Sequence, residues 1–221
     1  MIDSVAIVSG GMDSVTLLHY LVRRLGRTPA VLTFTYGQKH SKEVVFARRQ
    51  AELLGCAEHL LLDLSPLTPA FASSALVSPA LAIPDMAAVQ GDPQPPTYVP
   101  NRNMIFLAIA AALAEARDAG EVYYGAQRHD LYGYWDTTPQ FVEQINSLLA
   151  LNRKRAVRVQ TPFVHLSKAD ILRLGFELGV DYALTWSCYE GGVAACGVCP
   201  TCAERLQAFA EVGRSDPLPY R

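Results

Sequence analysis

The sequence has little charge and no long apolar run. Only 18% of its 221 residues are charged and 50% are hydrophobic, whereas a disordered chain would be rich in charge and poor in apolar residues. The formal net charge of −2 provides no overall field that would attract a nucleic-acid backbone. The longest apolar run, residues 104–114, is well short of the ~18 residues that a membrane span requires. We therefore expect a folded protein with no membrane segment and no direct nucleic-acid partner.

A secretory signal and a disulfide framework are also lacking. The first four residues, Met-Ile-Asp-Ser, contain neither a cationic segment nor a small-residue cleavage site. Of the five cysteines, four lie between Cys188 and Cys202, whereas an extracellular disulfide framework would spread them along the chain. These features predict a cytoplasmic protein with one local metal-binding knot.

Short apolar runs alternate with segments of helical periodicity. We predict strands at residues 5–8, 30–36, 58–63, 121–126 and 157–161. We predict helices at residues 13–26, 41–55, 103–117, 139–151 and 167–179. Ser41 and Ser167 are the expected N-caps of two of these helices. The alternation is typical of a doubly wound α/β fold with a mostly parallel five-stranded sheet, in which ligands bind beyond the carboxyl ends of the strands.

One long stretch, residues 65–100, interrupts this alternation. It contains eight of the 14 prolines and has no sustained periodicity. Such a stretch is usually a functional loop, a lid or partly disordered, and a passive insertion is the alternative. We expect residues 1–165 to form the main domain, with this stretch as an insertion, and residues 166–221 to form a helical C-terminal region that contains the clustered cysteines.

The segment Ser-Gly-Gly-Met-Asp-Ser at residues 9–14 lies between the first predicted strand and the first predicted helix. Its two glycines allow backbone N–H groups to turn around an anion, and the N-terminus of the following helix adds partial positive charge. The hydroxyls of Ser9 and Ser14 can complete such a cradle. The lysine of a Walker loop and the three glycines of the dinucleotide fingerprint are both missing. By pattern alone, a tight turn with Asp13 or Ser14 as a helix cap is the alternative.

The clustered cysteines have the pattern Cys-x7-Cys-x2-Cys-x2-Cys, formed by Cys188, Cys196, Cys199 and Cys202. Four thiolates at this spacing can close tetrahedrally on Zn²⁺. Because four ligands fill the shell and leave no position for an activated water, we expect a structural zinc, one per subunit. The same ligands can hold an iron–sulfur cluster, and the spacing does not distinguish the two. Cys56 lies at a predicted helix end and is expected to be an inert buried thiol.

Further polar residues gather where predicted strands end and helices begin. Arg102 precedes an apolar helix, where its guanidinium can contact phosphate or carboxylate. Lys168 lies in the first turn of a helix, which is unfavourable for a cation in the helix dipole and points to an anionic partner. Other polar segments follow the second and fourth predicted strands, at residues 36–40 and 125–136. Their recurrence at strand ends favours one shared ligand site.

These motifs resemble those of a known family. Residues 9–14 are similar to the pyrophosphate loop of the ATP-pyrophosphatases, which split ATP into AMP and pyrophosphate while activating a substrate oxygen. The segments Tyr-Gly-Gln-Lys-His, Val-Pro-Asn-Arg-Asn, Gly-Tyr-Trp-Asp and Ser-Lys-Ala-Asp and the cysteine pattern then occur in this order. Together, over residues 5–209, they resemble the QueC family of queuosine-precursor biosynthesis.

The resemblance implies a Rossmann-like fold of the adenine nucleotide alpha hydrolase type with a C-terminal zinc-binding helical region. It implies a cytoplasmic homodimer that acts on small molecules. The implied activity is that of an ATP-dependent carbon–nitrogen ligase, which converts 7-carboxy-7-deazaguanine and ammonia into the nitrile 7-cyano-7-deazaguanine. The implied intermediates are an adenylated carboxylate and an amide, with Mg²⁺ and ATP as cosubstrate.

The resemblance also implies site residues. Asp13 and Ser14 are expected to act in catalysis by holding pyrophosphate and its Mg²⁺. Arg102 and Lys168 are expected to neutralise phosphate charge. The nucleotide is expected to contact Val8, Ser9, Gly10, Gly11, Met12, Asp13, Ser14, Val15, Thr16, Leu17, Leu18, Tyr36 and Gln38.

Recognition of the deazaguanine is the least defined part of the expected site. From the chemistry of the ring, Asp130 and Asp136 are expected to read its amino edge or to orient ammonia, with Tyr134 or Trp135 stacking on it. Many family members have Cys-Arg immediately after Tyr-x-Asp, where this chain has Thr-Thr at residues 137–138. This difference removes a guanidinium that could face the substrate.

Other interpretations remain beside this one. The change at residues 137–138 leaves open a QueC-like enzyme that couples a deazaguanine to a different amine acceptor. Amidotransferases need a glutaminase, for which 221 residues leave no room, and tRNA-thiolating enzymes need a basic RNA-binding face. A non-catalytic zinc-knuckle module would need basic and aromatic knuckles, whereas residues 191–195 are Gly-Gly-Val-Ala-Ala.

A second difference from the family pattern lies at Asn101, where many QueC members have glycine. Asparagine is compatible with this position if it adopts the left-handed conformation.

Overall fold

A computed structural model of the chain describes residues 1–92, 94–128 and 134–221. Its centre is a parallel five-stranded sheet with the order β3-β2-β1-β4-β5. The chain thus starts in the middle of the sheet and winds first to one edge and then to the other, which confirms the predicted doubly wound fold. The strands are β1 (Ser4–Ile7), β2 (Pro29–Thr35), β3 (Glu58–Asp63), β4 (Glu121–Tyr123) and β5 (Arg158–Gln160).

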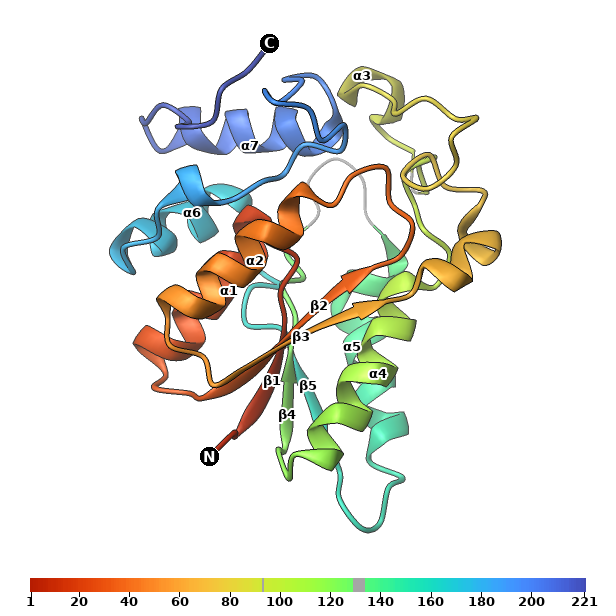
Figure 1. Cartoon of the computed structure of the whole chain (residues 1–221), viewed down its shortest axis with the longest axis vertical. Coiled ribbons are helices and arrows are strands. Elements are labelled where there is room, and N and C mark those ends of the chain that lie inside the picture. Colours follow the sequence, from red (N-terminus) through yellow and green to blue (C-terminus); the bar gives the residue numbers. More distant parts are fainter. Residues whose placement is uncertain (93, 129–133) are drawn as a thin grey trace.

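Helices cover both faces of the sheet (Figure 1). One face packs against α1 (Met12–His19), α2 (Lys42–Leu53) and α6 (Lys168–Glu177), and the other against α4 (Arg102–Ala116) and α5 (Pro139–Leu149). Successive strand residues enter opposite layers, because side chains alternate along a strand. Val5 and Leu32 pack on the α4 side, whereas Ala6 and Val31 pack on the α1 side. This double cover explains the continuous apolar runs of the central strands.

The remaining helices gather beyond the carboxyl edge of the sheet. α7 (Pro200–Glu211) packs on α6, and the short α3 (Met86–Val89) contacts α7 (Figure 1). Short helical segments complete the described structure: a π-helical turn at Tyr20–Arg24 and 3₁₀ helices at Ser65–Phe71, Trp135–Thr137 and Tyr182–Leu184. None of the helices in the described part of the chain is long and apolar enough to cross a membrane.

Element ends differ from the prediction in a few places. β4 ends at Tyr123, three residues early, because it pairs with only three residues on each side and the chain then turns away from the sheet. Ser167 caps α6 as predicted and forms a capping box with Asp170. Ser41 occupies the N-cap position of α2 as predicted, but its hydroxyl makes no capping hydrogen bond.

The proline-rich stretch, residues 65–100, packs against the rest of the fold. Phe71, Val77 and Val99 are buried in the layer that contains α4. Met86 N–H donates to the carbonyl oxygen of Val198 at 3.0 Å, which joins the stretch to the cysteine-containing region. The described part of this stretch therefore contributes to the core, although its periodicity predicts neither helix nor strand.

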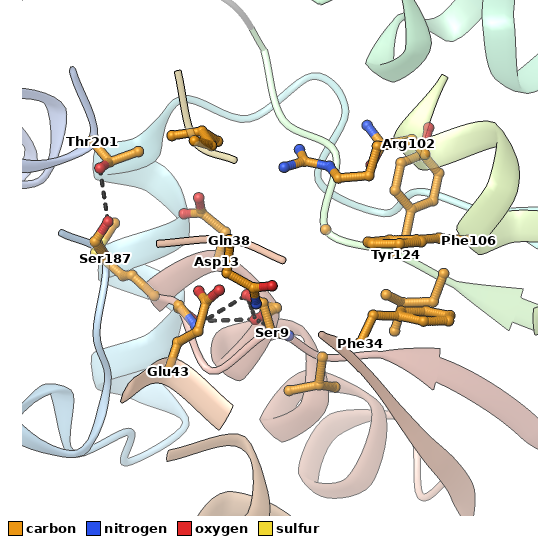
Figure 2. A pocket seen from close by; sticks show the side chains of 18 of the residues that line it. Ser9, Asp13, Phe34, Gln38, Glu43, Arg102, Phe106, Tyr124, Ser187 and Thr201 are labelled. Atoms are coloured by element: carbon orange, nitrogen blue, oxygen red, sulfur yellow. Dashed lines mark hydrogen bonds between the residues drawn. The ribbon is translucent and has the colours of Figure 1, made fainter. Parts of the chain in front are cut away.

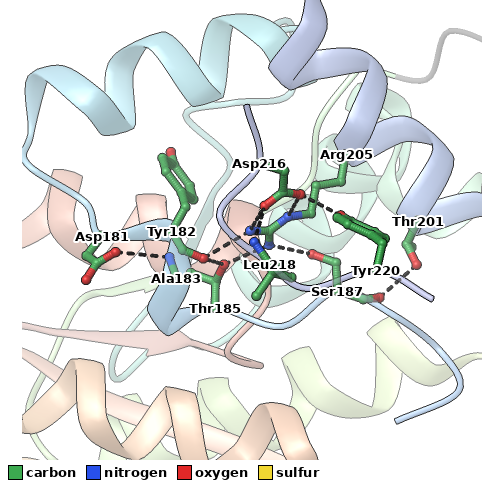
Figure 3. Close-up of polar contacts among 10 residues, drawn as sticks. All are labelled: Asp181, Tyr182, Ala183, Thr185, Ser187, Thr201, Arg205, Asp216, Leu218 and Tyr220. Atoms are coloured by element: carbon green, nitrogen blue, oxygen red, sulfur yellow. Dashed lines mark hydrogen bonds and ion pairs between the residues drawn. The ribbon is translucent and has the colours of Figure 1, made fainter. Parts of the chain in front are cut away.

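A buried ion-pair network joins α7 to the C-terminal segment (Figure 3). Arg205 and Asp216 are both 1% exposed and form two hydrogen bonds, of 2.6 and 2.9 Å. The guanidinium of Arg205 also donates to the hydroxyl of Thr185 and to the carbonyl oxygen of Tyr182, at 2.7 and 3.0 Å. Tyr220 donates its hydroxyl hydrogen to Asp216 at 2.5 Å. Arg205 therefore joins the chain before the first clustered cysteine, the helix that contains the last one, and the C-terminal segment.

The substitution Arg205→Met should destabilise the protein by about 3–5 kcal/mol, because it leaves the Asp216 carboxylate buried without its partner. Urea unfolding, followed by circular dichroism, measures this loss. The matched control Arg173→Met removes an exposed pair with Asp170 and should change the free energy of unfolding by less than about 1 kcal/mol. Equal effects of the two substitutions would contradict the importance of the buried network.

Candidate functional site

A pocket of about 300 Å³ opens at the carboxyl edge of the sheet. It is lined where β1, β2 and β4 end, by residues that include Val8, Tyr36 and Tyr124. β1 and β4 are the neighbours at which the winding changes direction, and open parallel sheets bind ligands at this point. Figure 2 shows two opposing sides, with Arg102, Phe34, Phe106 and Tyr124 on one and Ser9, Asp13, Gln38 and Glu43 on the other.

The glycine loop, residues 9–14, contributes backbone donors and hydroxyls to the pocket. Ser9 N–H and Gly10 N–H donate to Ser14 Oγ at 3.2 and 3.3 Å, and Gly11 N–H donates to Ser9 Oγ at 3.2 Å. Gly11 is the N-cap of α1 and has no side chain that could accept from the first helical N–H groups. The first N–H groups of α1 therefore have no side-chain cap, and the residues that carry them line the pocket, an arrangement that suits an anion.

Gly10 is required by a close backbone contact. Its φ is +100°, and a Cβ atom at this position would lie 2.0 Å from the backbone oxygen of Glu43. On the other side, Trp186 N–H donates to the carbonyl oxygen of Gly10 at 3.0 Å. The loop is thus clamped between the first turn of α2 and the segment that precedes Cys188.

Two predicted residues, Asp13 and Lys168, meet beside the loop. Lys168 Nζ lies 3.4 Å from Asp13 Oδ2 and 2.7 Å from Glu204 Oε2, and its side chain is only 15% exposed. Burial alone would lower the pKa of Lys168, but the two carboxylates more than offset this and raise it. Burial raises the pKa of Asp13, and the ammonium group of Lys168 opposes that rise. Asp13 Oδ1 is buried without a hydrogen-bond partner in the part of the chain that the structure describes.

Arg102 lies on the other side of the pocket, at the start of α4. The preceding Asn101 has φ 53° and ψ 19°, so it adopts the left-handed conformation that makes asparagine compatible with this position. Arg102 Nη1 donates to the Tyr36 hydroxyl at 3.1 Å. Next to it, Phe34 and Phe106 stack with their ring centroids 4.0 Å apart. This side of the pocket therefore combines a cation with flat apolar surfaces.

Glu43 lines the pocket, although the sequence analysis did not identify it. It lies in the first turn of α2, where an acidic residue reads as an ordinary helix-start charge. Burial raises the pKa of Glu43 to about 7, and Arg102 and Gln38 oppose that rise. Only the packing of α2 on the glycine loop places this carboxyl in the pocket, and nothing in the local sequence indicates that packing.

The four clustered cysteines converge as predicted. Their sulfur atoms all lie within 4.8 Å of one another, and all four side chains are buried. Two backbone N–H groups, of Glu190 and Cys196, donate to Cys188 Sγ at 3.4 and 3.3 Å, and Cys199 N–H donates to Cys196 Sγ at 3.3 Å. Such bonds favour thiolates, so the cluster has the ligand number, spacing and donors that a tetrahedral metal ion requires.

Residues next to the clustered cysteines form part of the pocket wall. Ser187 and Tyr189 flank Cys188, Thr201 precedes Cys202, and all three of these neighbours line the pocket. Thr201 donates its hydroxyl hydrogen to the carbonyl oxygen of Ser187 at 2.7 Å. The sequence analysis did not assign Ser187 or Thr201 to the site, because their role depends on where the cluster docks.

Lys42 fastens the cluster to α2. Its Nζ donates to the carbonyl oxygens of Gly192 and Val193 at 3.0 and 3.1 Å and lies 3.4 Å from the centroid of the Trp186 ring. α2 therefore contacts both the glycine loop and the loop between the first two cysteines.

The described residues that were expected to recognise the deazaguanine do not line the pocket. Asp136 is 2% exposed and lies behind the pocket wall, where it accepts a hydrogen bond of 3.3 Å from Asn103 N–H at the start of α4. Tyr134 stacks on Tyr98, and Trp135 is 42% exposed and packs on Phe141. Thr137 lines the pocket. Asp130 lies outside the described residues.

The fold and the site together define a doubly wound α/β protein with a glycine loop and a ligand pocket at the carboxyl edge of its sheet. The U34-tRNA thiolase NcsA from Methanococcus maripaludis shares this fold, with a TM-score of 0.52, 13% identity, and coverage of 96% of this chain and 65% of that one. The family described as queuosine biosynthesis protein QueC matches residues 3–213. The chain therefore belongs to the QueC family, as its motifs predicted.

Full-length relatives support this assignment. A 7-cyano-7-deazaguanine synthase from Caldicellulosiruptor saccharolyticus is 43% identical, over 98% of this chain and 95% of its own. A second 7-cyano-7-deazaguanine synthase, from a Marinomonas species, is 42% identical over 98% of this chain and 97% of its own. The prediction that the chain is an enzyme of this family is thereby confirmed.

The geometry of the loop predicts that Gly10→Ala and Gly11→Ala will differ sharply in their stability and in nucleotide binding. Alanine at Gly10 meets the backbone of Glu43 and must adopt a positive φ, so we expect a loss of about 2 kcal/mol or more in stability, together with lost nucleotide binding. At Gly11 the atom nearest to an added Cβ would be the Ser9 hydroxyl oxygen, at 3.3 Å, so Gly11→Ala meets no backbone atom at this distance. Thermal unfolding and ATP titration of both variants check this, and similar behaviour of the two would contradict the clamp.

Proposed function

We propose that this protein converts 7-carboxy-7-deazaguanine and ammonia into 7-cyano-7-deazaguanine at the expense of ATP. The observation that carries the proposal is the glycine loop at the end of β1, which opens into a pocket that also contains Lys168 and Arg102. Such a loop suits pyrophosphate, and the two cations suit additional phosphate charge. Membership in the QueC family and two closely related synthases support the choice of substrate.

The proposed reaction begins by activating an inert group. A carboxylate is a poor electrophile because its oxygens carry negative charge and oxide would have to leave. Attack of the carboxylate on the α-phosphate of ATP forms an acyl adenylate and releases pyrophosphate. Ammonia then displaces AMP and leaves an amide. A second ATP activates the amide oxygen in the same way, and loss of AMP leaves the nitrile.

The chain's own residues would act mainly by electrostatics and positioning. Ser9, Ser14 and the N–H groups at the start of α1 would hold the departing pyrophosphate. Lys168 and Arg102 would neutralise its charge from two sides. The buried Asp13 Oδ1 without a partner fits a cation, and Asp13 would hold Mg²⁺ there. When bound, Mg²⁺ supplies positive charge that stabilises the leaving group.

The cysteine cluster would hold a structural Zn²⁺, one per subunit. Four thiolates fill a tetrahedral shell, so the metal would stabilise the pocket wall at Ser187 and Thr201 and take no part in the chemistry. The same family resemblance leads us to propose a cytoplasmic homodimer. No nucleic-acid partner is proposed, since the net charge of −2 offers no electrostatic attraction.

A different amine acceptor is the second candidate function. It rests on Thr137, which lines the pocket at a position where many relatives carry cysteine. Thr138 takes the place of an arginine, and its side chain caps α5 by accepting from Phe141 N–H. Assays with ammonia and with larger amines, followed by mass measurement of the product, distinguish the two functions.

The direct test is incubation of the purified protein with 7-carboxy-7-deazaguanine, ammonium and Mg-ATP. We expect the nitrile, with two AMP and two pyrophosphate formed for each one. Release of ADP and orthophosphate would be incompatible with the proposal.

Lys168→Met should lower the rate at least about 100-fold, as expected for the loss of a group that stabilises the leaving pyrophosphate. Lys154→Met, at an exposed lysine, is the control and should leave the rate unchanged.

Cys202→Ser should remove the metal and loosen the pocket. We expect wild-type protein to contain one zinc per chain, and Cys202→Ser to contain much less and to unfold at lower temperature, because the four sulfurs form one closed set. Cys56→Ser is the matched control, since Cys56 lies outside the cluster, and it should keep its metal. Metal analysis and thermal unfolding provide the measurements. Iron with inorganic sulfide in place of zinc would show that the cluster serves another purpose.

A further inference from the structure

Glu43 is a carboxyl group in the pocket wall that the proposed phosphate chemistry does not use. It forms no ion pair within the described part of the chain, although it lies among pocket residues. Its backbone oxygen packs against Gly10, so the residue is held directly beside the glycine loop. The carboxyl therefore lines the same pocket as the glycine loop that is proposed to hold pyrophosphate.

Gln38 supplies a second unused group at the same place. Its Oε1 accepts a hydrogen bond of 2.7 Å from Tyr36 N–H, which fixes the orientation of the amide. The other end, Nε2, is buried and interacts with the Glu43 carboxyl, which opposes the rise in the pKa of Glu43. It has no other partner among the described residues, and because an amide nitrogen carries two N–H groups, at least one of them is left for a ligand. A buried donor that is left without a partner costs free energy and is typical of a site that a ligand completes.

The two residues together present a donor beside an acceptor. Gln38 Nε2 can donate to a carbonyl oxygen, and the carboxylate of Glu43 can accept from a neighbouring N–H group. A carboxamide has this pair of groups, and ammonia supplies the N–H groups alone. In the proposed reaction, both species occur at the carbon that becomes the nitrile.

We propose that Glu43 is a catalytic residue that binds the nitrogen of the incoming ammonia, and then of the amide, and accepts its protons, while Gln38 orients the amide oxygen. This inference rests on the proposed function and names the group that handles the nitrogen. It assigns to α2 a chemical role in addition to its packing on the glycine loop.

The proton balance shows why such a group is needed. When ammonia attacks the acyl adenylate, the C–N bond forms, the C–O bond to AMP breaks, and one proton leaves nitrogen. When the amide oxygen attacks the second ATP, pyrophosphate leaves and a proton leaves nitrogen. When AMP then departs, the C–O bond breaks, the C=N double bond becomes the triple bond of the nitrile, and nitrogen loses its third proton. Each proton would pass from nitrogen to the Glu43 carboxylate and then to water.

The surroundings of Glu43 suit this exchange. Burial raises its pKa to about 7, so the carboxyl can take up and release a proton near neutral pH. Arg102, which lies across the pocket, and the Gln38 amide oppose that rise. The other charged or titratable groups that line the same pocket come from five parts of the chain: Asp13 from α1, Lys168 from α6, Tyr124 after β4, Tyr189 beside Cys188, and Tyr36, Lys39 and His40 from the segment between β2 and α2.

The variant Glu43→Gln separates proton transfer from adenylation. We expect exchange of labelled pyrophosphate into ATP, with 7-carboxy-7-deazaguanine and no ammonia, to stay within about twofold of wild type. Nitrile formation at saturating ammonium should fall at least about 100-fold, the usual contribution of a general base. Glu52→Gln makes the same chemical change at an exposed position of α2 and should affect neither reaction.

The pH profile provides an independent readout. At a constant concentration of free ammonia, the wild-type rate should rise with pH through about 7, because the deprotonated carboxyl is the active form. This rise should be absent in Glu43→Gln and present, with a lower maximum, in Glu43→Asp.

The outcomes distinguish this inference from the proposed function. If wild-type protein shows neither pyrophosphate exchange nor a nitrile, the proposed function is wrong and the role of Glu43 is wrong with it. If wild type makes the nitrile but Glu43→Gln keeps its full rate, only the inference is overturned. If Glu43→Gln loses exchange and nitrile formation together, Glu43 serves the nucleotide, the acid substrate or the fold, and the inference is again overturned.

Discussion

The close approach of Gly10 to the backbone of Glu43 is the contact on which the rest of the site depends. A side chain at this position would overlap the first turn of α2, so only glycine lets the loop and the helix meet. From the other side, Trp186 N–H holds the same peptide. The loop therefore cannot move without displacing α2 and the segment before Cys188. A cradle that is fixed before its ligand arrives loses less free energy when it binds, and its donors are already aimed where charge develops.

The second constraint is that the cysteine cluster is built into the pocket. Its neighbours Ser187 and Thr201 face the same space as the glycine loop. Behind it, Arg205 joins α7 to the C-terminal segment through an ion pair that is almost completely buried. A cluster far from the site would only add stability, whereas this one also sets the shape of one wall. Loss of one cysteine ligand is therefore expected to change the shape of the pocket, because the neighbouring Ser187 and Thr201 line it.

Charge is distributed unevenly around the pocket. Lys168 lies between Asp13 and Glu204, so its ammonium is retained at low solvent exposure. Arg102 has an aromatic setting and a tyrosine hydroxyl as its partner. Glu43 differs from both because burial dominates its electrostatics, and its protonation can change near neutral pH. The proposed reaction first expels a polyanion and then removes protons from nitrogen. Two permanent cations suit the first step, and one titratable carboxyl suits the second.

The sequence by itself determined the alternation of strands and helices, the glycine loop, the cysteine set and the left-handed turn at Asn101. Each of these depends on local periodicity, on spacing or on the conformational range of one residue. Tertiary structure alone decided that Glu43 reaches the pocket, that Asp136 lies behind its wall, and that the neighbours of the clustered cysteines line it. These placements arise where segments far apart in the chain pack together. A carboxyl in a first helical turn reads the same in sequence whether it faces water or a ligand, because only the neighbouring elements determine which of the two it meets.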